Sequence, residues 1–126
     1  MNTTACKLLD SSAWIEYFEG NPILTKIVDG QTIILVSSIS LLEIKRKLLK
    51  EKIADEKIVR ILEFMQRRAQ VVEVSSEIAI QAAVFSHSNA LHAIDAIIYA
   101  SAQHHKAILL TGDNDFRNLQ GVEFVK

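Results

Sequence analysis

Two aspartates one residue apart follow a short apolar run near the C-terminal end of the sequence. Residues 108–115 read ILLTGDND, so a run typical of a buried strand leads through a Thr-Gly turn to Asp113 and Asp115. Near the N-terminus, KLLDSSAW (residues 7–14) carries Asp10 directly after two leucines. Crowded carboxylates raise one another's pKa values unless a cation neutralises them. Such strand-end aspartates therefore indicate a site for a hard divalent cation, Mg²⁺ or Mn²⁺.

Two further carboxylates fall within predicted helices. Asp95 lies in the apolar segment LHAIDAIIYASA, with no Lys or Arg within one helical turn, so it needs a partner elsewhere. His92 could be that partner, and a cation held in a polar cleft is the alternative that we favour. Glu43 has a structural explanation of its own, because it has capping-box spacing from Ser40 and an i,i+4 spacing to Lys47.

Structural explanations also exist for the strand-end aspartates. Asp10 could cap the following helix, although Ser11 or Ser12 could do so equally well. An Asx-turn explains one aspartate in TGDND more easily than two. If Asp10 belongs to a metal site, Asp10→Asn should leave the metal-free protein at least as stable as the wild type. Carboxylates that converge on a divalent cation are suited to cleaving a phosphodiester bond with an activated water.

The elements that position these carboxylates are short strands alternating with helices. This alternation indicates a single α/β domain over residues 1–126, built on a mainly parallel sheet. Ligands bind at the carboxyl ends of such strands, where Asp10 and Asp113 lie. The predicted strands are 7–10, 32–36, 71–74, 107–111 and 122–125. The predicted helices are 11–19, a short helix ending near 30, a helix from the serines at 37–40 to about 52, a helix capped by Asp55, a helix from Ser75 or Ser76 to about 88, and 93–104.

Composition sets outer limits on the function. The 126 residues are 49% hydrophobic and 23% charged with a net charge of −1, so nucleic-acid binding would need a local basic patch or a bound metal. The single cysteine excludes an internal disulfide. Without a signal-like N-terminal segment or an apolar run long enough for a bilayer, we expect a cytoplasmic protein outside the membrane.

Four segments in order, LLDSSAWIEYF, SISLLEIKRKL, LHAIDAIIYASA and ILLTGDNDF, resemble the PIN-domain ribonucleases. More narrowly, they resemble the VapC-type toxins of prokaryotic toxin–antitoxin pairs, over nearly the whole chain. The resemblance implies a sheet in strand order 3-2-1-4-5, dependence on Mg²⁺ or Mn²⁺, and cleavage of RNA. It also implies a homodimer and inhibition by a cognate antitoxin.

The resemblance also assigns roles to individual residues. It implies catalytic roles for Asp10, Glu43, Asp95 and Asp113; metal ligation by Asp10, Asp95, Asp113 and Asp115; and polar support from Ser11 beside Asp10 and from Thr111. Asp113 ranks above Asp115 as a ligand because it lies closer to the strand end.

Among the basic residues, Arg46 and Arg117 are the candidates for contacts with RNA phosphates. The remaining cations of residues 45–52 and 60–68 are expected to be solvated. Zinc binding by His104 and His105 is disfavoured, because no Cys or second His motif has zinc spacing. Apolar side chains in residues 58–65 and 78–85 exceed what one small sheet readily covers, which adds weight to a dimer.

Two alternative functions stay open on the sequence. A phospho-acceptor signalling domain would be expected to carry an acidic pair on its first strand, whereas Asp10 follows two leucines. A catalytically idle PIN-like binding scaffold is the other alternative. A nucleotide-binding module is disfavoured, because the chain has neither a G-x-G-x-x-G nor a G-x-x-x-x-G-K-[ST] motif.

Overall fold

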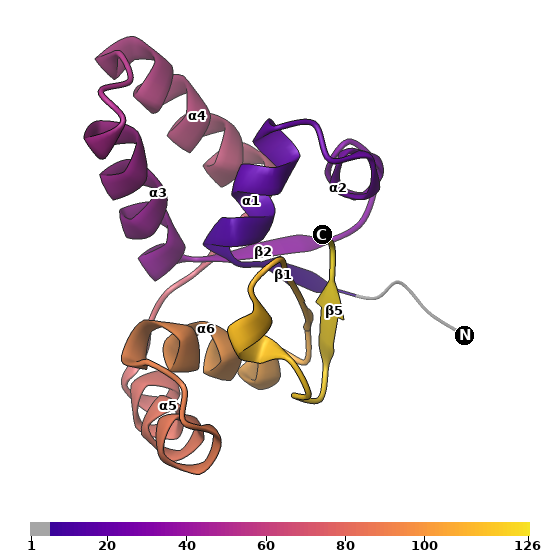
Figure 1. The fold of residues 1–126 in the computed structure, drawn as a ribbon, viewed down its shortest axis with the longest axis vertical. Helices are drawn as coiled ribbons and strands as arrows, with labels where there is room; N and C mark the ends of the chain where they lie inside the picture. Colours follow the sequence, from indigo (N-terminus) through magenta and orange to yellow (C-terminus); the bar gives the residue numbers. More distant parts are fainter. Residues whose placement is uncertain (1–5) are drawn as a thin grey trace.

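A computed structural model describes residues 6–126 as a five-stranded sheet between two layers of helices (Figure 1). Part of the N-terminal segment considered for a targeting signal lies outside these described residues. Within residues 6–126, no helix is both long and apolar enough to cross a bilayer.

The sheet has the predicted strand order, and every neighbouring pair is parallel. Its order is β3-β2-β1-β4-β5. From β1 the chain adds β2 and β3 on one side and then β4 and β5 on the other, so the topological switch point lies between β1 and β4. Ligand sites of parallel sheets lie at this switch point, beyond the carboxyl ends of the strands. The strands are β1 (Lys7–Leu9), β2 (Ile34–Ser37), β3 (Gln70–Val72), β4 (Ile108–Thr111) and β5 (Val122–Phe124).

The helices follow the sequence prediction closely, and the predicted segment 93–104 has the observed bounds. They are α1 (Ser11–Phe18), α2 (Pro22–Val28), α3 (Ser38–Lys50), α4 (Asp55–Arg68), α5 (Ser76–Asn89) and α6 (Ala93–His104), with a 3₁₀ turn, η1 (Asn114–Phe116), after β4.

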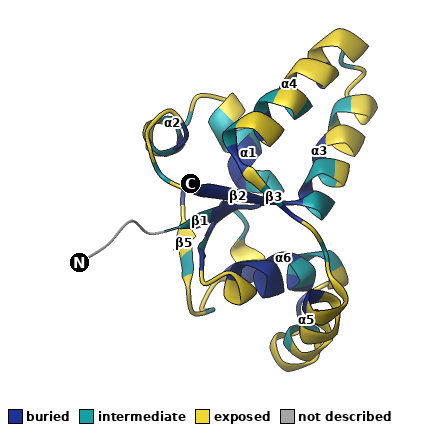
Figure 2. Cartoon of the chain, turned by 180° about the vertical axis from the view of Figure 1, so that it is seen from behind, coloured by how far each residue is buried: buried dark blue, intermediate teal, exposed yellow. Residues whose placement is uncertain are grey.

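Alternating strand side chains supply two separate cores. Leu8 and Leu109 face α5 and α6, whereas their neighbours Leu9 and Leu110 face α1 to α4. The strands are therefore buried on both faces, as parallel sheets require, and the outer faces of α4 and α5 are exposed (Figure 2). This double packing holds the carboxyl ends of β1 and β4 in fixed positions.

Polar residues before the helices act as caps, with two differences from the prediction. Ser37 and Ser75 cap α3 and α5 through their hydroxyls. The cap of α1 is Asp10, not either of the serines that follow it. Asp55 is the first residue of α4 rather than its cap, because Ala54 occupies the cap position without a side-chain hydrogen bond.

Arg68 is not the solvated cation that its place in a charge-rich helix predicts. Its guanidinium donates to the carbonyls of Val28 at 2.6 Å and Thr32 at 2.7 Å, with longer bonds to Ile27 and Gly30. These carbonyls lie at the end of α2 and in the connection to β2, so Arg68 fixes the entry of the chain into the central sheet.

Candidate active site

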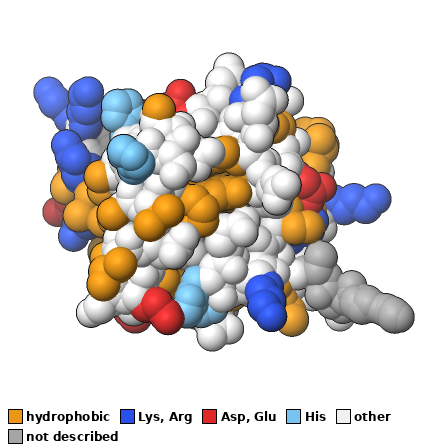
Figure 3. Space-filling view, turned by 90° about the horizontal axis from the view of Figure 1, so that it is seen from below, with side chains coloured by type: hydrophobic (Ala, Val, Ile, Leu, Met, Phe, Trp, Pro, Cys, Tyr) orange, Lys and Arg blue, Asp and Glu red, His pale blue; other side chains and the backbone are white. Residues whose placement is uncertain are grey.

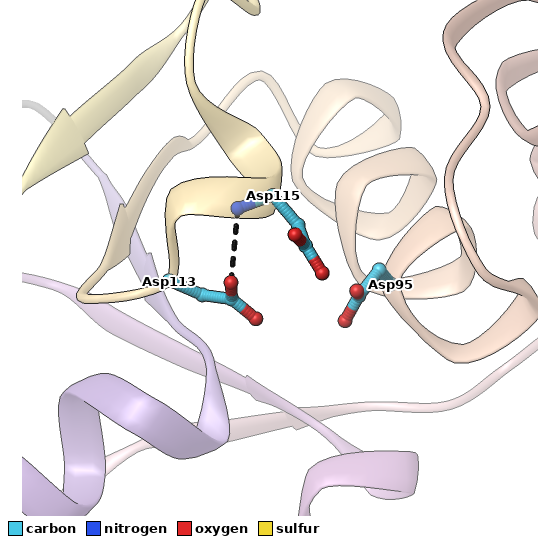
Figure 4. Close-up of side chains that lie close together, drawn as sticks. All are labelled: Asp95, Asp113 and Asp115. Carbon is cyan, nitrogen blue, oxygen red and sulfur yellow. Dashed lines mark hydrogen bonds between the residues drawn. The ribbon is translucent and has the colours of Figure 1, made fainter.

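Three carboxylates meet beyond the carboxyl end of β4. Each of Asp95, Asp113 and Asp115 offers an oxygen atom, and these atoms lie within 4.8 Å of one another. Figure 4 shows Asp95 projecting from α6 toward the two aspartates of the turn after β4. The Asp115 backbone N–H donates to Asp113 Oδ1 at 2.9 Å, which fixes the turn. Asp113 and Asp115 therefore enter the group together, and neither stands apart as the better placed ligand.

Asp95 carries an electrostatic cost within this group. Its side chain is half-buried, and burial together with the charges of Asp113 and Asp115 raises its pKa to about 6. Glu43 and Asp10 add smaller contributions in the same direction. His92 is exposed and makes no ion pair with Asp95. The crowding of like charges is the condition that a divalent cation relieves.

Asp10 lies beside this group rather than inside it. The carboxylate is only 5% exposed, and three donors occupy it: the Ser12 hydroxyl at 2.7 Å, the Ala13 N–H at 2.8 Å and the Thr111 hydroxyl at 2.5 Å. Burial raises the Asp10 pKa, while these hydrogen bonds counteract part of the rise. Asp10 is thus both a helix cap and a neighbour of the acidic group, since the charge of Asp113 also raises its pKa.

Ser12, to which the sequence assigned no site role, links Asp10 to the acidic turn. Besides donating to Asp10, its hydroxyl oxygen accepts the Gly112 N–H at 2.9 Å. Thr111 acts in parallel, because its hydroxyl donates to Asp10 and accepts the Asp113 N–H at 2.9 Å. The two hydroxyls connect the start of α1 to a turn about a hundred residues later in the chain. The signal for Ser12 in the sequence was its place in the D-S-S segment, but this order does not tell which of the two serines contacts the turn.

The Thr111 hydroxyl should contribute measurably to stability. Thr111→Val keeps the shape but leaves Asp10 Oδ2 and the Asp113 N–H without their observed partner. An unsatisfied buried polar group typically costs about 1–3 kcal/mol, and we expect a loss of that size in urea unfolding at pH 7. Thr111→Ser retains the hydroxyl and should lose much less. Equal losses in the two variants would show that the hydroxyl is not the cause, because Thr111→Ser retains it.

Glu43 faces the site from α3. Its Oε1 accepts a hydrogen bond from the Ser11 hydroxyl at 3.1 Å, so Ser11 supports Glu43 and not Asp10, contrary to the expectation. Burial is the main cause of the raised Glu43 pKa, and the charges of Asp10 and Asp113 add to it. Neither structural explanation for Glu43 is observed, because Ser37 caps the helix and Lys47 pairs with Glu51 at 2.7 Å.

A family model for the PIN domain matches residues 7–122. The chain belongs to the PIN domain family. No curated protein matches the chain in a sequence search.

Solved structures share the whole fold of this PIN domain at low sequence identity. A DNA-bound VapBC complex from Salmonella typhimurium aligns with a TM-score of 0.80 and 19% identity, over 97% of this chain and 99% of the other. A toxin–antitoxin complex from Klebsiella pneumoniae gives 0.75 and 23%, over 93% and 95%. Mycobacterium tuberculosis VapC20, described as a Sarcin-Ricin loop cleaving toxin, gives 0.69 and 16%, over 87% and 92%.

The two basic candidates of the PIN domain differ in their surroundings. Arg46 is exposed on α3, and its charge offsets part of the rise in the Glu43 pKa. Arg117 turns back onto its own segment, where it donates to Asn114 Oδ1 at 2.6 Å and lies 5.0 Å from the centre of the Phe124 ring. Arg46 and Glu43 line one hollow on α3, whereas Arg117 is held against the turn.

The donor set of this PIN domain suits a hard cation. Its three clustered ligands are all carboxylate oxygens, without Cys or His, which matches the preference of Mg²⁺ and Mn²⁺. His104 lies 3.4 Å from Glu77 instead. The residues at the switch point therefore fit Mg²⁺ or Mn²⁺ better than zinc.

Proposed function

We propose that this PIN domain is a Mg²⁺- or Mn²⁺-dependent endoribonuclease and the toxin of a toxin–antitoxin pair. The observation that supports it most is the convergence of Asp95, Asp113 and Asp115 within 4.8 Å, with the Asp95 pKa raised to about 6. Asp95 and Asp113 would hold the metal, with Asp115 as a further ligand and Asp10 as a partner from β1. A bound divalent cation would supply positive charge that stabilises the phosphate oxygens during cleavage.

Within the proposal, Glu43 is the proton acceptor. A carboxylate whose pKa is raised by burial is a better base at neutral pH than an ordinary one, and a hydrogen bond from Ser11 holds it at the edge of the acidic group. It would take a proton from the water that attacks phosphorus. The P–O bond to the leaving nucleotide then breaks, and the leaving oxygen takes up a proton from solvent, so the reaction is a hydrolysis.

The metal requirement and the attacking group can be tested together. Purified protein, stripped with EDTA, is incubated with single-stranded and hairpin RNAs before and after addition of Mg²⁺ or Mn²⁺. We expect cleavage only with added metal, and products without a 2′,3′-cyclic phosphate, because water and not the 2′-hydroxyl attacks. Cleavage that persists in EDTA, or cyclic phosphate ends, would contradict this mechanism. An absence of cleavage on every RNA would favour the idle scaffold.

The proposed partner is a cognate antitoxin that occupies the acidic group. Several structural neighbours are described as toxin–antitoxin or VapBC complexes. An arginine side chain from such a partner would pair with carboxylates in a bidentate manner and would compete with the metal. The antitoxin would thus inhibit by charge complementarity as well as by covering the site.

A homodimer is also part of the proposal, and it would use only the exposed part of the apolar segments that the sequence suggested. Ile58, Met65 and Ile78, in the two apolar segments, are buried in the chain's own cores. The exposed apolar side chains of α5 are Ile80 and Val84, at 72% and 51% exposure. Hydrophobic side chains spread across the face seen from the side of α5 and α6 (Figure 3).

A further inference from the structure

A hollow on α3 begins at Glu43 and continues along basic side chains. Its volume is about 790 Å³, and it is lined by Glu43, Arg46, Lys47, Leu49, Lys50 and Glu51. Glu43 also accepts a hydrogen bond from Ser11, the neighbour of Asp10 in the chain, so this end of the hollow is the one nearest to the proposed active site. A scissile phosphate would therefore lie beyond the Glu43 end of the hollow.

Helical spacing puts the site residue and two cations on one face. Glu43, Arg46 and Lys50 stand at i, i+3 and i+7, which on an α-helix are successive turns of the same face. At a rise of about 1.5 Å per residue, Arg46 lies about 4.5 Å and Lys50 about 10.5 Å along the axis from Glu43. A stacked strand carries one phosphate about every 3.4 Å along its axis, so this length corresponds to about three nucleotides.

The two cations are available for an external anion. Among the residues that the structure describes, neither Arg46 nor Lys50 has a carboxylate within ion-pair distance. Lys47 differs, because Glu51 neutralises it at 2.7 Å. Both Arg46 and Lys50 are exposed, so neither supports the core.

We propose that Arg46 and Lys50 hold two RNA backbone phosphates on one side of the scissile phosphate, with the strand running along α3. This inference rests on the proposed ribonuclease function. The protein carries a net charge of −1, so attraction of RNA must come from a local feature of this kind. An RNA backbone fits better than an acidic segment of a protein partner, because the cationic face starts at Glu43, the proposed proton acceptor, beside which the scissile phosphate is expected.

The test measures binding of a fluorescein-labelled, unstructured RNA oligonucleotide by anisotropy in Mg²⁺, at 50 to 200 mM NaCl. All proteins carry Asp113→Asn, which prevents cleavage during the measurement. Arg46→Ala with Lys50→Ala is compared with Lys45→Ala with Arg60→Ala. The second pair removes the same charges from exposed positions, one of them on the opposite side of α3.

Each phosphate contact to a single strand contributes about 0.7 to the salt slope, so loss of both should reduce the slope by about 1.4. The weakening of binding between 50 and 200 mM NaCl should then be about sevenfold smaller than in the parent. The control pair should keep the slope of the parent. No change in the first pair, or an equal change in both pairs, would overturn the proposal.

Two further measurements separate the possible failures. If a poly-glutamate peptide binds through Arg46 and Lys50 while the RNA does not, the face belongs to a protein partner and the proposal is wrong. Cleavage by the wild type in Mg²⁺ is assayed separately. A protein that binds RNA through α3 but never cleaves it would contradict the ribonuclease function and leave the binding face established.

Discussion

Asp95→Asn and Asp113→Asn should each lower metal-dependent RNA cleavage by at least about 100-fold. Loss of a residue that only orients a metal ligand typically costs about 10–100-fold, and loss of a ligand itself should cost no less. Both side chains contribute an oxygen to the group within 4.8 Å, and asparagine keeps their shape while removing the charge. The measurement is the initial rate of cleavage at saturating RNA in Mg²⁺.

The control is Glu63→Gln, which removes one carboxylate charge from an exposed position on α4. It should retain the wild-type rate. Asp115→Asn belongs in the same series, because the structure brings Asp115 into the group together with Asp113. Wild-type rates in both Asp95→Asn and Asp113→Asn would remove the basis of the proposed site.

The fold could be predicted because its signals are local. Strand segments are short runs of apolar residues, and the segment 93–104 keeps an apolar face throughout. The alternation of strands and helices then allows few topologies, since parallel strands need crossovers of one hand. The strand order itself came from the family resemblance, and the structure confirms it.

The details of the site depended on distant contacts and could not be read from local patterns. Asp10, Ser11 and Ser12 all have good N-cap propensity. Gly112 and Thr111 decide between them, because they bond to Ser12 and Asp10 from the far end of the chain. The same applies to Arg68, whose carbonyl partners lie about forty residues away.

The sequence led us to expect that Asp10→Asn would leave the metal-free protein at least as stable as the wild type. The contacts in the structure make Asp95→Asn the better candidate for such a substitution. Asp10 accepts three hydrogen bonds, and an asparagine there would have to reorient the Thr111 hydroxyl. Among the residues described, the Asp95 side chain accepts no hydrogen bond, and burial and neighbouring carboxylates raise its pKa. Removing the Asp95 charge therefore relieves repulsion without breaking an observed contact.

In EDTA at pH 7.5, Asp95→Asn should melt at a higher temperature than the wild type. The folded pKa of Asp95 is about 6, above the usual value of 3.8, so the folded state holds its proton more tightly than the unfolded state. Well below pH 3.8 the carboxyl group is protonated in both states, and its charge has no effect. As the pH rises from about 4 to about 6, the wild type loses stability, and this cost persists at neutral pH. Allowing for solvent screening at a half-buried site, we expect a difference of about 1–2 kcal/mol.

Mg²⁺ should reverse this order. At a concentration about a hundredfold above its dissociation constant, a ligand stabilises the folded state by about 2.7 kcal/mol. The wild type should gain this amount, whereas Asp95→Asn should gain far less. Asp55→Asn is the control, because Asp55 also lies in the first turn of a helix, where the helix dipole favours a negative charge. It should lose a little stability in EDTA and retain the full Mg²⁺ shift. If Asp95→Asn behaves like Asp55→Asn, Asp95 serves only the helix start, and the acidic group lacks the ligand from α6 that completes it.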